Sequence, residues 1–196
     1  VNVREVIINS IIEAQAYTDD KVEFLLKAQN NFFNHYKNYE IEVLKRNKLN
    51  TIYTIKKGDD SILINSVNSA WMTRIPCEPG QIIINPENFE IKEYNYSLQI
   101  LIMHHTLMWY TQELQRELRN NLGIYYDFVL TGHEHQDSQH KIILDEEDAS
   151  VVMIEGSELK LSCNNESDGF NLLYINTTNS EYKRNKYVFN TKQKIY

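Results

Sequence analysis

Two stretches of this sequence decide its fold: residues 98–105 read LQILIMHH, and residues 127–136 read DFVLTGHEHQ. Each contains an apolar run of strand length, and nearly continuous runs of this kind are typical of strands that are buried on both faces. A helix is predicted between them, at roughly 111–122. Strand, helix and strand at this spacing form a small α/β unit. The sequence therefore predicts an α/β fold in which the strands near 98–103 and 127–131 are adjacent and parallel.

The region before this unit divides into a helical part and a strand-rich part. Residues 1–48 show helical periodicity of apolar positions, and Asp20 is expected to cap a second helix within them. From Thr51 the pattern changes: residues 52–55 and 62–67 have the composition of strands, and the turn residues 57–60 lie between them. This pattern predicts a β-hairpin.

The region after the unit is rich in predicted strands. Four strand-like runs are present near 142–144, 151–154, 170–176 and 186–190. We expect these runs to form a β-meander that closes one side of the sheet. The predicted organisation is therefore an N-terminal helical segment over residues 1–48, followed by an α/β sheet with a β-rich tail over residues 51–196.

The composition bears on the class of protein. The 196 residues are 42% hydrophobic and 24% charged, as in ordinary soluble domains. No apolar run approaches the ~20 residues that span a bilayer, so no membrane partner is expected. The net charge of -7 argues against a broad nucleic-acid footprint. Two isolated cysteines, Cys77 and Cys163, are interpreted as reduced thiols of a cytoplasmic protein.

Histidines follow both predicted buried strands at the point where each strand ends. His104 and His105 come directly after the first strand, and His133 and His135 follow the second. Ligands of α/β sheets bind outside the carboxyl ends of the strands, so we expect three or four of these imidazoles to meet there. Neutral imidazole is a common ligand of zinc, manganese and iron. The sequence therefore predicts a metal site at this edge of the sheet.

Other polar residues are given more ordinary roles. His35 and His140 are isolated in the sequence, so we interpret them as surface or core residues. Glu134 lies between His133 and His135, and its side chain is expected to point away from both. Gly132 allows the backbone to turn sharply away from the end of the strand.

These motifs together resemble those of a known superfamily. Residues 101–105, followed by Leu107, resemble the fourth motif of calcineurin-like metallophosphoesterases. Residues 127–136, which contain Gly-His-x-His, resemble their fifth motif. Residues 64–71 resemble the strand and Asn-Ser turn that precede these two motifs. Because the order, the spacing and the β-rich tail also fit, the resemblance covers most of the chain.

The resemblance implies a site for two divalent metal ions, of manganese, iron or zinc, that hydrolyses phosphate mono- or diesters. In such enzymes an aspartate and a hydroxide bridge the metals, and the hydroxide attacks the phosphate ester. The resemblance implies that His104 and His133 bind one metal and that His135 binds the other. It also implies a catalytic role for His105 and a substrate-binding role for Asn68.

The sequence departs from the family pattern in its first three motifs. Asp-x-His, Gly-Asp-x-x-Asp and Gly-Asn-His-Asp are absent, and residues 58–60 are a predicted hairpin turn that does not replace them. A smaller departure is Thr106, where the family usually has proline. The start at Val1 resembles the segment directly after Gly-Asn-His-Asp in full-length members of the family. We therefore interpret residues 1–196 as the C-terminal portion of one metallophosphoesterase-type α/β sandwich, whose partner is the missing N-terminal portion.

Two alternatives to a phosphoesterase stay open at this point. The first is a metallophosphoesterase-like fold that has lost catalysis and serves as a binding or regulatory module. The second is a mononuclear zinc hydrolase in which three histidines hold one ion with an open position. Because the bridging aspartate is absent, we expect this chain alone to be inactive as a two-metal enzyme.

Overall fold

The computed structural model describes residues 2–36, 43–76, 78–92, 95–134, 138–143, 150–156 and 169–188. The helices are α1 (Val3–Ala14), α2 (Asp19–Leu26), α3 (Asn30–Tyr36) and α4 (Gln112–Tyr125), and the 3-10 helices are η1 (Lys27–Gln29), η2 (Pro86–Asn88) and η3 (Leu107–Trp109). The strands are β1 (Val43–Arg46), β2 (Asn50–Lys57), β3 (Asp60–Val67), β4 (Leu98–Met103), β5 (Phe128–Thr131), β6 (Ser138–Ile143), β7 (Ser150–Glu155), β8 (Gly169–Asn176) and β9 (Glu181–Val188).

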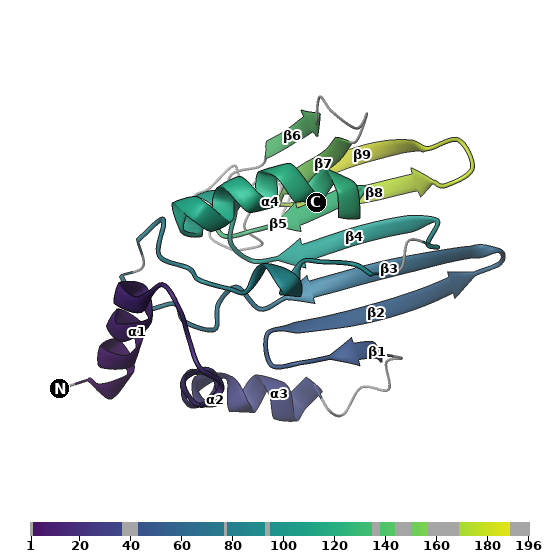
Figure 1. The fold of residues 1–196 in the computed structure, drawn as a ribbon. Coiled ribbons are helices and arrows are strands. Elements are labelled where there is room, and N and C mark those ends of the chain that lie inside the picture. The colour runs from purple at the N-terminus through teal and green to yellow at the C-terminus, as the bar shows by residue number, and fades with distance from the viewer. Residues whose placement is uncertain are drawn as a thin grey trace.

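Seven of these strands form one mixed sheet in the order β1-β2-β3-β4-β5-β7-β6 (Figure 1). Strands β3, β4, β5 and β7 run parallel to their neighbours within this group, whereas β1, β2 and β6 pair antiparallel. The register of β4 against β5 places Ile100 opposite Phe128 and Leu101 opposite Val129. The prediction of an α/β fold with these two strands adjacent and parallel is therefore confirmed.

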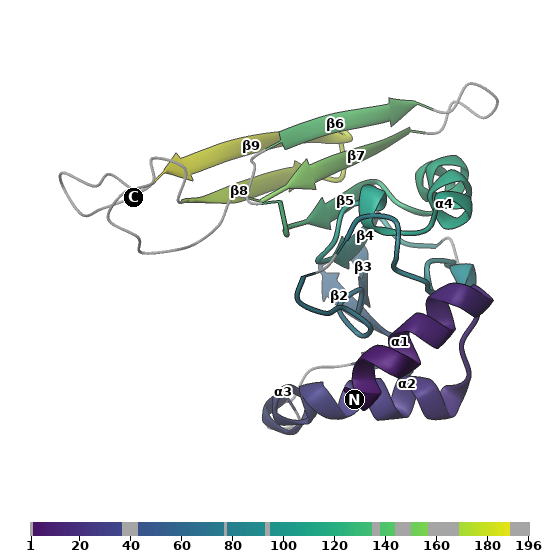
Figure 2. The ribbon, with the colours of Figure 1, turned by 90° about the vertical axis from the view of Figure 1, so that its left-hand side faces the viewer.

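Both faces of the central strands are covered, which explains their continuous apolar sequence. On one face, Leu101 and Val129 belong to a core that includes the buried side of α4. On the other face, Leu98 and Phe128 belong to a second core, against which Leu173 of β8 packs. Figure 2 shows α4 on one side of the sheet and the two-stranded β8–β9 ribbon on the other.

The antiparallel pairing of β2 with β3 confirms the predicted hairpin. Gly58 in its turn has a φ of 63°, a left-handed conformation that glycine adopts without steric cost. The prediction of a helical segment up to residue 48 is wrong at its end, because β1 forms a strand there. Val43–Arg46 pairs with β2 and so extends the hairpin into a third strand.

Two further predictions about the elements need correction. The N-cap of α2 is Thr18, so Asp20 lies inside the first turn. Its negative carboxylate there interacts favourably with the positive end of the helix dipole. The tail is β-rich as predicted, but it is not one meander. β7 inserts beside β5 as a parallel strand, and β8 and β9 form a separate sheet. Positions 144, 189 and 190 of the predicted runs lie outside the described residues.

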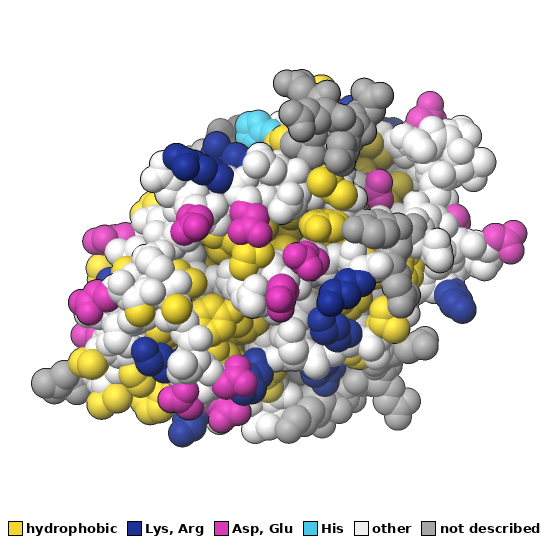
Figure 3. All heavy atoms as spheres, viewed as in Figure 1, with side chains coloured by type: hydrophobic (Ala, Val, Ile, Leu, Met, Phe, Trp, Pro, Cys, Tyr) yellow, Lys and Arg dark blue, Asp and Glu magenta, His cyan; other side chains and the backbone are white. Residues whose placement is uncertain are grey.

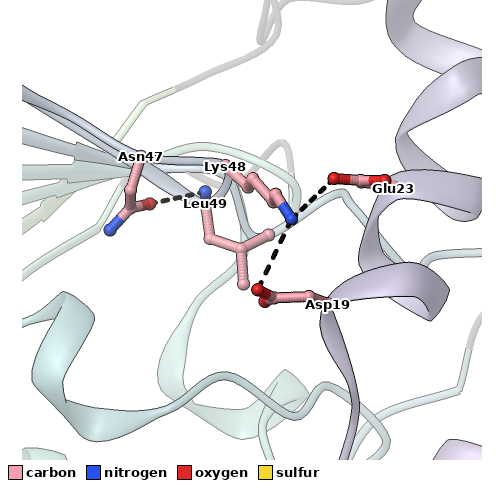
Figure 4. A network of polar contacts seen from close by, with 5 residues as sticks. All are labelled: Asp19, Glu23, Asn47, Lys48 and Leu49. Carbon is pink, nitrogen blue, oxygen red and sulfur yellow. Dashed lines mark hydrogen bonds and ion pairs between the residues drawn. The ribbon is translucent and has the colours of Figure 1, made fainter.

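Polar contacts fasten α2 to the turn between β1 and β2 (Figure 4). The Lys48 ammonium lies 2.8 Å from a carboxylate oxygen of Glu23 and 3.6 Å from one of Asp19. In the same turn, the backbone N–H of Leu49 donates to the side-chain oxygen of Asn47 at 2.7 Å. The two ion pairs link α2 to the turn, and the hydrogen bond to Asn47 stabilises the turn itself. None of the helices in the described ranges is long and apolar enough to cross a membrane.

The helix-side core generates a stability prediction at two neighbouring positions of β4. Leu101 is completely buried, whereas Ile102 is 38% exposed on the opposite face. We expect Leu101→Ala to lower the free energy of unfolding by about 2–5 kcal/mol, the usual cost of a cavity in a packed core. Ile102→Ala is the matched control and should lower it by about 1 kcal/mol. Urea unfolding measures both, and equal losses would contradict the assigned faces of β4.

Candidate metal centre

The histidines lie where the two central parallel strands end. β4 ends at Met103, directly before His104 and His105, and β5 ends at Thr131, two residues before His133. The N–H of Gly132 donates to the carbonyl of His104 at 3.0 Å, so the two chain segments stay joined beyond the strands. The predicted convergence at the carboxyl edge of the sheet therefore has a direct backbone cause.

The backbone turns tightly at the second segment. His133 has a φ of 43°, a left-handed conformation that is uncommon for residues other than glycine. The N–H of Glu134 donates to the carbonyl of Gly132 at 2.7 Å, which closes a turn around His133. This turn directs the His133 ring toward the end of β4.

Three imidazoles meet at this point, and we call His104, His105 and His133 the histidine cluster. Nδ1 of His133 lies 2.9 Å from Nε2 of His104. One potential ligand nitrogen from each of the three rings lies within 4.8 Å of the other two. The predicted meeting of His104 and His133 is confirmed, and His105 joins them. His135 lies outside the described residues.

His105 is the most enclosed member of the cluster, with 2% of its surface exposed. Its Nδ1 lies 2.9 Å from the hydroxyl oxygen of Ser69, two residues after the end of β3. Burial foremost, and then the neighbouring rings of His133 and His104, lower the pKa of His105 from 6.5 to about 3. His105 is therefore neutral at physiological pH. With Nδ1 at Ser69, Nε2 is the nitrogen that remains for the cluster.

The aromatic ring of Trp109 packs against His133. The Trp109 ring, on η3, meets the His133 ring edge to face at a centroid distance of 4.3 Å. Trp109 Nε1 donates to the Glu134 carboxylate, and the Glu134 N–H donates to Glu155 at 3.2 Å. Burial raises the pKa of the Glu155 carboxyl. Glu134 thus holds the Trp109 ring beside His133. Among the described residues, the group that could hold a metal ion consists only of histidines.

The cluster faces a cavity of about 340 Å³. The side chains that line the cavity are those of the histidine cluster and of Ala70, Thr73, Arg74, Ile75 and Trp109. The Arg74 guanidinium donates to the amide oxygens of Asn9 and Gln81, at 2.7 and 3.2 Å. Both acceptors are neutral, so these two bonds leave the positive charge of Arg74 uncompensated.

The other residues singled out in the sequence lie elsewhere. Asn68 lines a separate cavity of about 690 Å³ beside α2, α3 and β2. Its side-chain N–H donates to Gln29 at 2.7 Å, while the next residue, Ser69, is the one that reaches the cluster. His35 and His140 are exposed on α3 and β6, outside the cluster. Sequence reasoning missed Ser69, although the Asn-Ser turn in the family resemblance contains it.

The cluster offers three imidazole nitrogens that could hold a metal ion. Zinc binds imidazole nitrogen at about 2.0–2.1 Å, which separates tetrahedral ligand nitrogens by about 3.3 Å. The 2.9 Å between the nitrogens of His104 and His133 is close to that separation. A small spreading of these two rings would make room for an ion. Because all three rings line the cavity, such an ion would be reachable from it.

No protein-family model and no curated protein matches the sequence.

The centre generates a prediction about metal binding. We expect His133→Ala and His104→Ala each to weaken zinc binding by more than about 100-fold. Loss of a hydrogen-bond partner outside the ligands already weakens metal binding by about 10–100-fold, and loss of a ligand is more severe. Competition with a fluorescent zinc chelator measures the affinity. The control is His35→Ala, an exposed histidine of α3, which should leave it unchanged; equal losses in all three variants would contradict the site.

Proposed function

We propose that this chain is part of a metal-dependent phosphoesterase and supplies the histidine side of its metal site. One observation carries the proposal: His104, His105 and His133 meet at the carboxyl ends of β4 and β5. These are the residues that the fourth and fifth metallophosphoesterase-like motifs contain. The reaction is the hydrolysis of phosphate mono- or diesters.

The histidines have distinct parts in this proposal. His104 and His133 would hold a divalent ion of manganese, iron or zinc, and His135 would bind a second. A bound metal polarises the phosphoryl oxygens and lowers the pKa of a water molecule so that it can attack phosphorus. The lowered pKa of His105 makes it a weak general base near neutral pH. A ligand or orienting role suits His105 better than proton transfer.

The cavity has features that suit a phosphate ester. Arg74 brings a guanidinium to its wall, and guanidinium matches the oxygens of a phosphate. Trp109 and the fully exposed Ile75 give the same wall an apolar part, against which an organic substituent can pack. On the face drawn in Figure 3, acidic and basic side chains are interspersed. The net charge of -7 favours small phosphate esters over nucleic acids.

Two-metal chemistry also requires a bridging carboxylate. The metal-compatible group in the described part of the chain offers imidazoles alone. In this proposal the bridging aspartate belongs to the N-terminal portion of the same domain, upstream of residue 1.

A cytoplasmic location belongs to the proposal as well. It rests on the two isolated cysteines, Cys77 and Cys163, which lie outside the described residues.

The proposal predicts the activity of this chain and of a longer one. With added manganese, we expect this chain to hydrolyse bis-p-nitrophenyl phosphate at least about 100-fold more slowly than a protein that includes the upstream sequence. The several kcal/mol that a complete metal site contributes to catalysis correspond to at least such a factor. In the longer protein, His133→Ala should abolish turnover while His35→Ala should not. Release of p-nitrophenolate measures both.

Two outcomes would contradict the proposal in different ways. Equal activity of the two proteins, lost in His133→Ala, would favour a mononuclear hydrolase formed by this chain alone. Zinc binding without turnover in either protein would favour a binding or regulatory module that has lost catalysis.

A further inference from the structure

An apolar face crosses the seven-stranded sheet on the side of the β8–β9 ribbon, and we call it the ribbon-side face. The strand registers place four apolar side chains opposite one another in one row of this face: Ile64 of β3, Ile100 of β4, Phe128 of β5 and Val152 of β7. Partners in neighbouring strands point to the same face of a sheet, so this row is one surface. The row above it continues onto β2, where Ile55 lies opposite Ile62.

The ribbon covers only one end of the ribbon-side face. At that end, Phe128 and Val152 are 5% and 8% exposed and belong to the core against which β8 packs. Figure 2 shows the ribbon alongside β6 and β7. Farther from the ribbon, Ile55 of β2 and Ile102 of β4 are 48% and 38% exposed. The apolar face therefore continues beyond the element that covers it.

β8 is the ribbon strand that borders the exposed part of this face. Thr177, directly after β8, donates to the carboxylate of Asp60 in β3 at 2.9 Å. β9 lies toward the opposite end of the sheet, where the Tyr182 hydroxyl accepts from Gln139 of β6 at 2.7 Å. Along one edge β8 pairs with β9, and in the described part of the chain these two strands form a sheet of their own. The other edge of β8, its outer edge, faces the side of β3 and β4.

The composition of β8 differs from that of an edge strand exposed to water. β8 reads GFNLLYIN, eight residues without a charged side chain or a proline. Charged residues and proline are what edge strands commonly carry to prevent pairing with a further strand. The neighbouring strand β9, in contrast, reads EYKRNKYV and carries four charged side chains: Glu181, Lys183, Arg184 and Lys186. The sequence of β8 is therefore that of a strand with a partner on both edges.

The exposed face and the outer edge of β8 together specify what kind of element fits there. A layer that covers the face beside the ribbon also shields the outer edge of β8 from water. Shielded backbone N–H and C=O groups need hydrogen-bond partners, which a strand beside β8 supplies and a helix does not. The same strand would direct alternate side chains onto the face, across the usual spacing of about 10 Å between packed sheets.

We propose that the ribbon-side face over β2, β3 and β4 is an interface for a β-strand that pairs with the outer edge of β8 at residues 172–176 and extends the ribbon into a larger second sheet. The strand carries apolar side chains at alternate positions. The side chains that receive it are Ile55, Ile62, Ile64, Ile100 and Ile102. The strand comes from the N-terminal portion of the same domain, and this source rests on the proposed function.

Hydrogen exchange measured by mass spectrometry tests the pairing, in this chain and in a longer protein that includes the upstream sequence. Successive N–H groups of a strand point to opposite edges, so about half of the amides of residues 172–176 belong to the outer edge. We expect these amides to exchange at least about 100-fold more slowly in the longer protein. The control is β6, an outermost strand of the seven-stranded sheet in the described part of the chain, which should exchange equally in both proteins.

Matched substitutions test the face itself. Ile102 and Ile124 are each 38% exposed, but Ile124 lies on α4. In this chain, Ile102→Lys and Ile124→Lys should lower the Tm by amounts within about 2 °C of each other. In the longer protein, Ile102→Lys should lower the Tm by at least about 5 °C more than Ile124→Lys, because the new ammonium would be buried without a partner.

Four results would separate the parts of this proposal. Equally fast exchange of residues 172–176 in both proteins would refute the added strand, even if the longer protein hydrolyses phosphate esters. Equal Tm losses for the two lysine variants in the longer protein would refute the interface. Protection of β8 in this chain that grows with protein concentration would refute the N-terminal source and assign the face to a second copy. Protection of β8 in a longer protein without turnover would support the interface while the proposed function fails.

Discussion

The parallel pairing of β4 with β5 is the constraint on which the candidate centre depends. Its register runs from Ile100 opposite Phe128 to Ile102 opposite Leu130, and it brings the two strand ends level. A shift by one residue would exchange the two faces of β5 and turn its buried side chains toward the wrong core. The register is thus fixed by burial on both faces, and the meeting of His104 and His133 follows from it.

This arrangement separates the parts of the protein that give stability from those that give chemistry. The buried side chains of α4 recur every four residues, at Leu114, Leu118 and Leu122, and cover one face of the sheet. The β8–β9 ribbon covers the other face through Leu173 and Ile175. The histidines lie beyond both layers, at the strand ends. Residues that could hold a metal ion can therefore be polar without interrupting either core.

The sequence predicted the central elements well because their pattern is local. Leu98–Met103 is a strand with the predicted bounds, since its apolar residues fill both cores. β1 was missed because its four residues, VLKR, carry little strand signal and become a strand through pairing with β2. The placement of β8 and β9 in a separate sheet was also missed, because strand patterns do not specify which partner a strand takes.

Some residues of the candidate site could be predicted from the sequence, and others could not. His104 and His133 were predictable, since each follows a strand whose end could be located. Ser69 and Trp109 were not, because their contacts with the histidines depend on the path of the chain after β3 and through η3. The sequence placed the functional contact at Asn68, one residue before the side chain that reaches His105.

The ends of the seven-stranded sheet have a consequence for the behaviour of the protein in concentrated solution. β1 and β6 are the outermost strands in the described part of the chain, and edge strands can template association with other copies. β1 is only four residues long and includes Lys45 and Arg46, while β6 carries Lys141 in its exposed stretch. The short length of β1 and the positive charges on both strands disfavour the addition of another strand. The sheet is therefore built to stop at these two edges, which protects the protein against edge-to-edge aggregation.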